Sequence, residues 1–188
     1  MNKRKISTFF QNSEGNMLIL FACFFVVLTF FLGLSLDIGM IYMKRGEMQN
    51  LCQIIREDRF TYQDSVRYAD NPGQACYELV CGTASQNGFA GEVKVYFQEE
   101  PPAYNYRHYR VRTELIDWYS FTFGRLLGID ETELHVTLDS GESYGEGSTD
   151  VIWYPPASAS SYNGSYTSRD DGSFVYDSAD FPADWSGI

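Results

Sequence analysis

An uninterrupted apolar run over residues 17–36 constrains this chain more than any other feature of its sequence. The run has twenty residues without a charge, and only mild interruptions such as Gly33 and Ser35 occur in it. As a helix it would cover roughly 30 Å, the thickness of the hydrocarbon layer of a bilayer. A cleavable secretory signal has a shorter apolar region followed by small residues, whereas Asp37 follows this run. We therefore predict a retained transmembrane helix, with the lipid bilayer as its partner.

Charges on the two sides of the run indicate its orientation. Lys3, Arg4 and Lys5 precede it, so residues 1–16 are predicted to form a cytoplasmic N-terminal segment. Basic residues follow the run as well, but the long stretch beyond it is acidic, and the whole chain has a net charge of −11. We expect the N-terminus inside and the remainder exported. The negative balance also argues against nucleic acid as a partner, because phosphate binding needs a basic surface.

A helical pattern continues beyond the apolar run. Residues at spacings of three and four form one mostly apolar stripe with charged ends: Ile41, Arg45, Met48, Cys52, Ile55 and Arg59. No proline occurs before position 72. We predict one helix over about residues 18–59, whose second half stands outside the bilayer as a stalk with one stripe to cover.

The next segments predict a second helix and a small sheet. Residues 71–74 read Asn-Pro-Gly-Gln, which combines an N-cap, a proline at the first helical position and a capping-box glutamine. Asn87-Gly88 supplies the terminator. Residues 120–128 predict a short helix with a serine cap and a glycine stop. Alternating apolar residues predict strands at 93–97, 109–115 and 134–138. Together these segments predict an exported α+β domain over residues 37–139, with a mainly antiparallel sheet.

Residues 140–188 differ in composition from the rest of the chain. They are rich in Ser, Gly, Tyr and Asp, low in aliphatic residues and acidic. Such a stretch has little apolar surface with which to offset its ordering entropy, so we predict an irregular tail. Two apolar islands interrupt it, at residues 151–154 and 174–176. Either island would add an edge strand or dock on a partner.

The cysteines leave two alternatives open. Cys23 lies in the apolar run, where it acts as a small apolar residue. Cys76 and Cys81 are five residues apart on the second predicted helix, roughly 8 to 9 Å, which is too far for a bridge. Cys52 would therefore form a disulfide with Cys76 or with Cys81 across the helical pair, or all three are reduced packing residues.

Nothing in the sequence favours catalysis. The chain lacks the G-x-S-x-G, H-E-x-x-H and P-loop patterns, and it has only two histidines. We therefore predict that the protein is not an enzyme, with no catalytic residues, no cofactor, no metal and no evident small-molecule substrate.

One region of the apolar helix suits contact with another helix. Leu and Phe gain nothing from leaving lipid for protein, so small residues and polar contacts must provide the preference. Gly33, Ser35 and Gly39 are small, and Asp37 lies between them. We predict a helix–helix assembly surface at these four residues.

Two stretches of the N-terminal region resemble a known family. Residues 14–22 read Glu-Gly-Asn-Met-Leu-Ile-Leu-Phe-Ala, and residues 37–45 contain the pattern D-x-G-x-x-Y-x-x-R. Both look like the start of TadE/TadG-like proteins of the bacterial tight-adherence (Flp-type) pilus system. An F-x-x-L-L-G element at residues 123–128 matches the later order of that family. The resemblance covers about residues 13–139.

The resemblance implies a pilin-like fold and an inner-membrane minor pilin or pseudopilin that helps assemble a pilus. Its partners would be other pilus-assembly proteins or minor pilins. Gly15 would be the processing site, but Leu20 stands where TadE-type members have Glu, so the TadG-like branch fits better. A second interpretation is a single-pass surface receptor or adhesin that binds an external ligand through its acidic aromatic tail.

Overall fold

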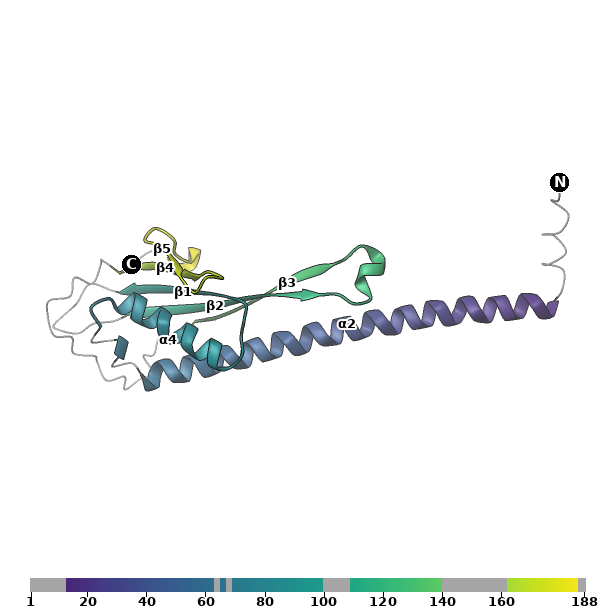
Figure 1. Cartoon of the computed structure of the whole chain (residues 1–188), viewed down its shortest axis with the longest axis horizontal. Helices are drawn as coiled ribbons and strands as arrows, with labels where there is room; N and C mark the ends of the chain where they lie inside the picture. Colours follow the sequence, from purple (N-terminus) through teal and green to yellow (C-terminus); the bar gives the residue numbers. More distant parts are fainter. Residues whose placement is uncertain (1–12, 63–64, 67–68, 100–108, 140–161, 186–188) are drawn as a thin grey trace. The chain divides into compact units, whose positions relative to one another are not determined.

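A computed structural model describes residues 13–62, 65–66, 69–99, 109–139 and 162–185 of the chain (Figure 1). Its elements are helices α2 (Ser13–Thr61) and α4 (Pro72–Gln86), strands β1 (Glu92–Glu99), β2 (Tyr109–Ser120), β3 (Glu131–Asp139), β4 (Gly164–Ser168) and β5 (Phe174–Asp177), and the short 3₁₀ helices η2 (Gly124–Leu127) and η4 (Ala183–Trp185). This arrangement confirms the predicted α+β class, with a long N-terminal apolar helix, a second helix and an antiparallel sheet.

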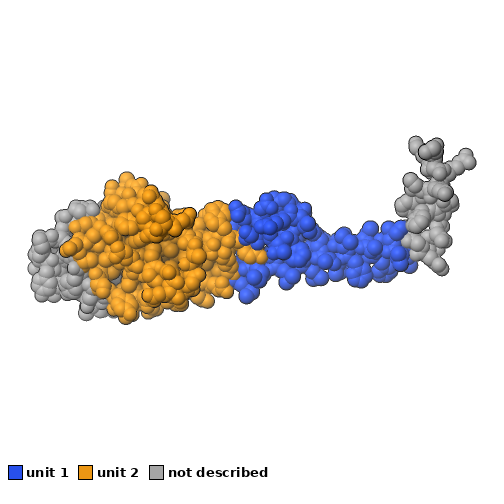
Figure 2. Space-filling view, in the orientation of Figure 1, with its two compact units in different colours: residues 1–43, 120–132 blue, residues 44–119, 133–188 orange. Residues whose placement is uncertain are grey.

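The chain divides into two compact units, coloured separately in Figure 2. One unit consists of residues 1–43 and 120–132, and the other of residues 44–119 and 133–188. The first combines the apolar part of α2 with the turn between β2 and β3. The second contains the rest of the sheet, α4 and the C-terminal part of α2.

Helix α2 begins at Ser13 and ends at Thr61, so it confirms the single long helix. It is continuous because no proline interrupts it, and its glycines are isolated. Its N-terminal part is long and apolar enough to cross a membrane. Side chains of this part lie almost entirely on the surface, with Phe25 61% and Val26 70% exposed.

Helix α4 starts as its sequence predicts. The Asn71 side chain accepts a hydrogen bond from the Gln74 backbone nitrogen at 3.0 Å, and Pro72 occupies the first turn. After the helix, Gly88 has a positive φ of 77°, a conformation that glycine adopts without strain. The predicted cap and terminator are therefore both present.

The sheet has the strand order β3-β2-β1-β4-β5, with β1 at its centre. β1 pairs antiparallel with β2 on one side and with β4 on the other. Val95 marks this central position, because it faces Thr113 across one pairing and Tyr166 across the other. All three of these residues are buried.

Two strands correct the prediction of an irregular tail. β4 pairs with β1, and β5 pairs with β4, so residues within 162–185 complete the sheet. Island 174–176 does add an edge strand, as one of the two alternatives expected, whereas island 151–154 lies outside the described residues. The low aliphatic content of residues 140–188 did not predict these strands, because the hydrophobic side chains that they bury are aromatic.

Tyr166 on β4 is one of the buried aromatic residues of this stretch. It is 1% exposed, and its ring lies against those of Tyr77 on α4 and Phe174 on β5, with centroids 6.2 and 5.6 Å away. Its hydroxyl donates a hydrogen bond to the Tyr162 carbonyl at 2.9 Å. Gly73 in the first turn of α4 packs so closely against this tyrosine that a Cβ atom would collide with it. Tyr166 thus joins α4 to the added strands.

The stalk part of α2 contributes its stripe to the core of the second unit. Four of its six predicted members are buried, Met48, Cys52, Ile55 and Arg59, and the neighbouring Leu51 is buried as well. Helix α4 and the inward face of strands β1 to β3 contribute further core residues: Cys76, Tyr77, Val80, Ala84, Val93, Val95, Phe97, Val111, Leu115, Leu134 and Val136. A hydrogen bond also joins α4 to α2: the Thr83 hydroxyl donates to the Asp58 carboxylate at 3.0 Å.

We predict that Tyr166→Ala destabilises the second unit by about 3 to 5 kcal/mol, the usual cost of removing a large aromatic side chain from a core. Val175→Ala is the matched control, because Val175 lies on the neighbouring strand and is 40% exposed. Its effect should stay within about 0.5 kcal/mol. Urea unfolding of the full chain in detergent, followed by near-ultraviolet circular dichroism, measures both. Equal effects of the two substitutions would contradict the burial of Tyr166 between α4 and β5.

Candidate functional site

Asp37 is the most constrained polar residue of the first unit. It follows the apolar run directly, and yet it is only 2% exposed. Its carboxylate accepts three backbone hydrogen bonds, from the nitrogens of Thr122 at 3.1 Å, Phe123 at 2.8 Å and Gly124 at 2.9 Å. All three donors belong to the turn that joins β2 to β3. A buried carboxylate is tolerated when its oxygens are bonded in this way.

The carboxylate in turn satisfies backbone nitrogens of the turn between β2 and β3. η2 begins at Gly124, and the first nitrogens of a helix have no partner inside it. The predicted serine cap is not formed, since the residue before η2 is Phe123, which makes no side-chain capping bond. Asp37 caps the turn instead, from a helix more than eighty residues earlier in the chain. The predicted glycine stop is present, because Gly128 is left-handed with φ 79°.

Gly33 lies one turn before Asp37 on the same face of α2. The ring of Phe123 packs against it so closely that a Cβ atom at Gly33 would collide with the ring. Gly33 is buried, although its neighbours Phe31 and Leu32 are more than half exposed. The turn therefore contacts α2 in two ways. The Phe123 ring packs against Gly33, and three backbone nitrogens of the turn bond to the Asp37 carboxylate.

The four residues predicted to form an assembly surface separate into two pairs. Gly33 and Asp37 contact the turn of their own chain. Ser35 is exposed, and its hydroxyl donates to the Phe31 carbonyl one turn earlier at 2.9 Å. Gly39 is exposed and has open space where a Cβ atom would point. The assembly role of these residues stays a prediction, and Ser35 and Gly39 are the two members that the described residues leave exposed.

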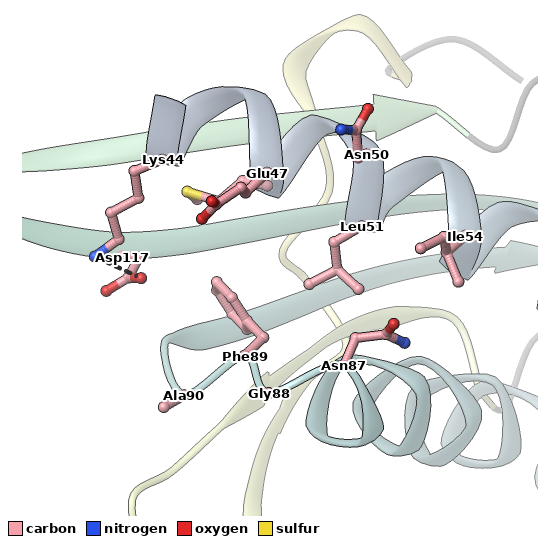
Figure 3. A pocket seen from close by; sticks show the side chains of 11 residues that line it. Lys44, Glu47, Asn50, Leu51, Ile54, Asn87, Gly88, Phe89, Ala90 and Asp117 are labelled. Atoms are coloured by element: carbon pink, nitrogen blue, oxygen red, sulfur yellow. Dashed lines mark ion pairs between the residues drawn. The ribbon is translucent and has the colours of Figure 1, made fainter. Parts of the chain in front are cut away.

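A pocket of about 430 Å³ lies within the second unit. Figure 3 shows the ion pair of Lys44 and Asp117 at one end of it, and the side chains of Leu51 and Phe89 along it. The Lys44 ammonium is 2.8 Å from the Asp117 carboxylate and donates to the Trp118 carbonyl at 2.7 Å. These two charged groups pair with each other, and the rest of the lining mixes apolar side chains such as Leu51 and Phe89 with the polar side chains of Glu47, Asn50 and Asn87.

No group of three or more His, Cys, Asp and Glu side chains suited to a metal ion occurs in the part of the chain that the structure describes. All four cysteines are free thiols in the structure. Cys52 and Cys76 are buried in the core, and Cys81 is partly exposed. A bridge from Cys52 to Cys76 or Cys81 stays a prediction, as does processing at Gly15, which lies near the start of α2.

Comparison with known proteins bears on the N-terminal part of this site. Residues 15–53 match a family model described as "Putative Flp pilus-assembly TadE/G-like". The predicted TadE/TadG-like resemblance is confirmed over these residues. The match contains Gly33, Asp37 and Gly39, whereas the turn that docks on them lies outside it. Comparisons with curated proteins and with solved structures gave no match.

We predict that Asp37→Ala releases the turn from α2. Hydrogen bonds to a charged group contribute about 1.5 to 3 kcal/mol each. Because the three bonds share one carboxylate their contributions do not add, and a net loss of about 3 kcal/mol is expected. The amides of Thr122, Phe123 and Gly124 should then exchange with solvent roughly a hundredfold faster. Ser35→Ala is the control, because its hydroxyl bonds only to its own helix. Hydrogen exchange read by mass spectrometry of the full chain tests this, and unchanged exchange in Asp37→Ala would contradict it.

Thiol alkylation tests the state of the cysteines. Burial raises the pKa of the Cys52 and Cys76 thiols to about 11, and the thiolate is the reactive form. Both should resist iodoacetamide at neutral pH in the folded protein. After unfolding without reductant, all four cysteines should be labelled, as counted by intact mass. Two missing labels that return after reduction would show that a disulfide forms.

Proposed function

We propose that this protein is a membrane-anchored minor pilin or pseudopilin-like component that takes part in assembly of a Tad/Flp-type pilus. The TadE/G-like match over residues 15–53 carries the proposal, and it supports a Tad pilus-assembly component. This match covers the apolar part of α2 and the D-x-G-x-x-Y-x-x-R pattern that follows it. The protein acts by binding other subunits and has no enzymatic activity.

The topology of the proposal follows from α2. Its apolar side chains, such as Phe25 and Val26, are exposed to their surroundings and need lipid around them. We place the helix once across the bacterial cytoplasmic membrane, with residues 1–16 inside and the acidic α+β part exported. Basic residues 3–5 on the inner side support this orientation.

Assembly would occur through the helix surface that the chain leaves open. Between helices in lipid, close approach at small residues provides packing that large apolar side chains do not. Gly39 is open in this way, and Ser35 is exposed beside it. Gly33 cannot serve another subunit while the Phe123 ring covers it. The proposed contact with other pilus subunits therefore centres on Gly39.

We predict that Gly39→Leu weakens crosslinking to partner subunits about tenfold, which corresponds to a packing loss of about 1.4 kcal/mol. Gly46→Leu is the matched control, because Gly46 also lies within α2 and has open space at its Cβ position, but it is about two turns further from the end of the apolar run than Gly39. In a deletion strain complemented with each variant, Gly39→Leu should lower piliation and Gly46→Leu should not.

The same strains separate this proposal from the receptor or adhesin interpretation. Replacing residues 140–161 with a Gly/Ser linker of equal length retains β4 and β5, which a deletion of residues 140–188 would remove. Normal piliation in the deletion strain would contradict the assembly role. Loss of adhesion on linker replacement, with piliation unchanged, would favour the receptor interpretation.

A further inference from the structure

The turn between β2 and β3 exposes a group of large apolar side chains. Leu126 is 74% exposed, Leu127 is 56% exposed and Ile129 is 47% exposed. All three lie within four consecutive positions at the tip of the hairpin, two on η2 and Ile129 just after its C-cap Gly128. A cluster of exposed apolar side chains on a folded turn indicates a surface that contacts another protein or a membrane.

The contact with α2 fixes the depth of this tip relative to the apolar run. Phe123 packs on Gly33, which precedes the last residue of the run, Leu36, by three positions or about 4.5 Å along the helix. Asp37, one residue after the run, bonds the nitrogens at the start of η2. The tip therefore lies beside the final turn of the apolar segment, within the same compact unit.

We propose that this tip inserts into the lipid interface of the bilayer that α2 crosses, as a second contact that does not span the membrane. The inference rests on the proposed membrane anchoring. Its occupant is phospholipid at the boundary between head groups and acyl chains, because the bilayer that surrounds Gly33 also reaches the side chains beside it. Arg125 is exposed on the same turn, where its guanidinium can meet a phosphate.

The backbone of the turn is suited to this environment. A non-helical segment can enter an apolar region only if its polar backbone groups have partners. The nitrogens of residues 122–124 bond to Asp37. Further along, the Leu126, Gly128 and Ile129 nitrogens donate to carbonyls within the turn, at 3.1, 3.0 and 3.1 Å, and the Phe121 nitrogen donates to Asp130. The tip thus presents apolar side chains while these amide groups are bonded internally.

Site-specific photocrosslinking in the full chain tests the inference. Leu126→p-benzoylphenylalanine places the photoreactive group at the most exposed apolar position of the tip. The purified protein is irradiated in vesicles of phosphatidylethanolamine and phosphatidylglycerol, and also in membranes of the producing bacterium. We expect an intact-mass increase of one phospholipid in both. Ile129→p-benzoylphenylalanine is the second tip variant, which keeps the test decisive if the first fails to fold.

Two control positions make the outcomes distinguishable. The same group at Val26 in the apolar run should give the lipid adduct if α2 is the anchor, and at Val175 on β5 it should give none. A lipid adduct at Val26 without one at either tip position would overturn this inference and leave the anchor intact. Loss of the adduct at Val26 and at the tip would overturn both the insertion of the tip and the anchoring of α2 in the membrane. A crosslinked second copy or other protein at the tip, in place of lipid, would also overturn it.

Discussion

The first unit depends on the hydrogen bonds that the Asp37 carboxylate accepts from the turn between β2 and β3. Burying the charge of Asp37, which follows the apolar run within α2, is costly, and burying unpaired amide nitrogens at the start of η2 would be costly in the same surroundings. The carboxylate and the amide nitrogens offset each other's burial cost, because three of these nitrogens donate hydrogen bonds to the one carboxylate. Phe123 then packs on Gly33 one turn away, so the hydrogen bonds and the ring contact reinforce one another.

This arrangement divides α2 into two sides with different uses. Gly33 and Asp37 are four residues apart and share the side that the turn covers. Gly39 is two residues beyond Asp37, which places it about 200° around the helix from that carboxylate. The turn consequently covers one side and leaves the other open. A helix whose charged residue is already satisfied within the chain can present a small, uncharged surface to a partner in lipid.

The sequence predicted local features well and long-range pairing poorly. The cap at Asn71 and the alternation in β1 to β3 are encoded by residues close together, so α4 and three strands could be recognised. β4 could not, because Tyr166 is buried by Tyr77 and Phe174, and a composition rich in Ser, Gly and Tyr gives no aliphatic signal. Asp37 was singled out from its position, but its partner was not. Nothing near residues 122–124 indicates that their cap comes from α2.

A tip held in the lipid interface would also constrain the anchor itself. A single apolar helix is free to rotate about its axis, because lipid surrounds all of its sides equally, and the length of its apolar run fixes its depth only approximately. The tip, attached to α2 through Asp37 and Gly33, would be a second contact with lipid and would make one side of the helix different from the others. Leu126 and Leu127 reach lipid only when the turn lies at the height of the interface. The opposite side, with Gly39, is then presented in one direction and at one depth. The intrachain contact at Asp37 would in this way set the geometry in which another subunit meets the helix.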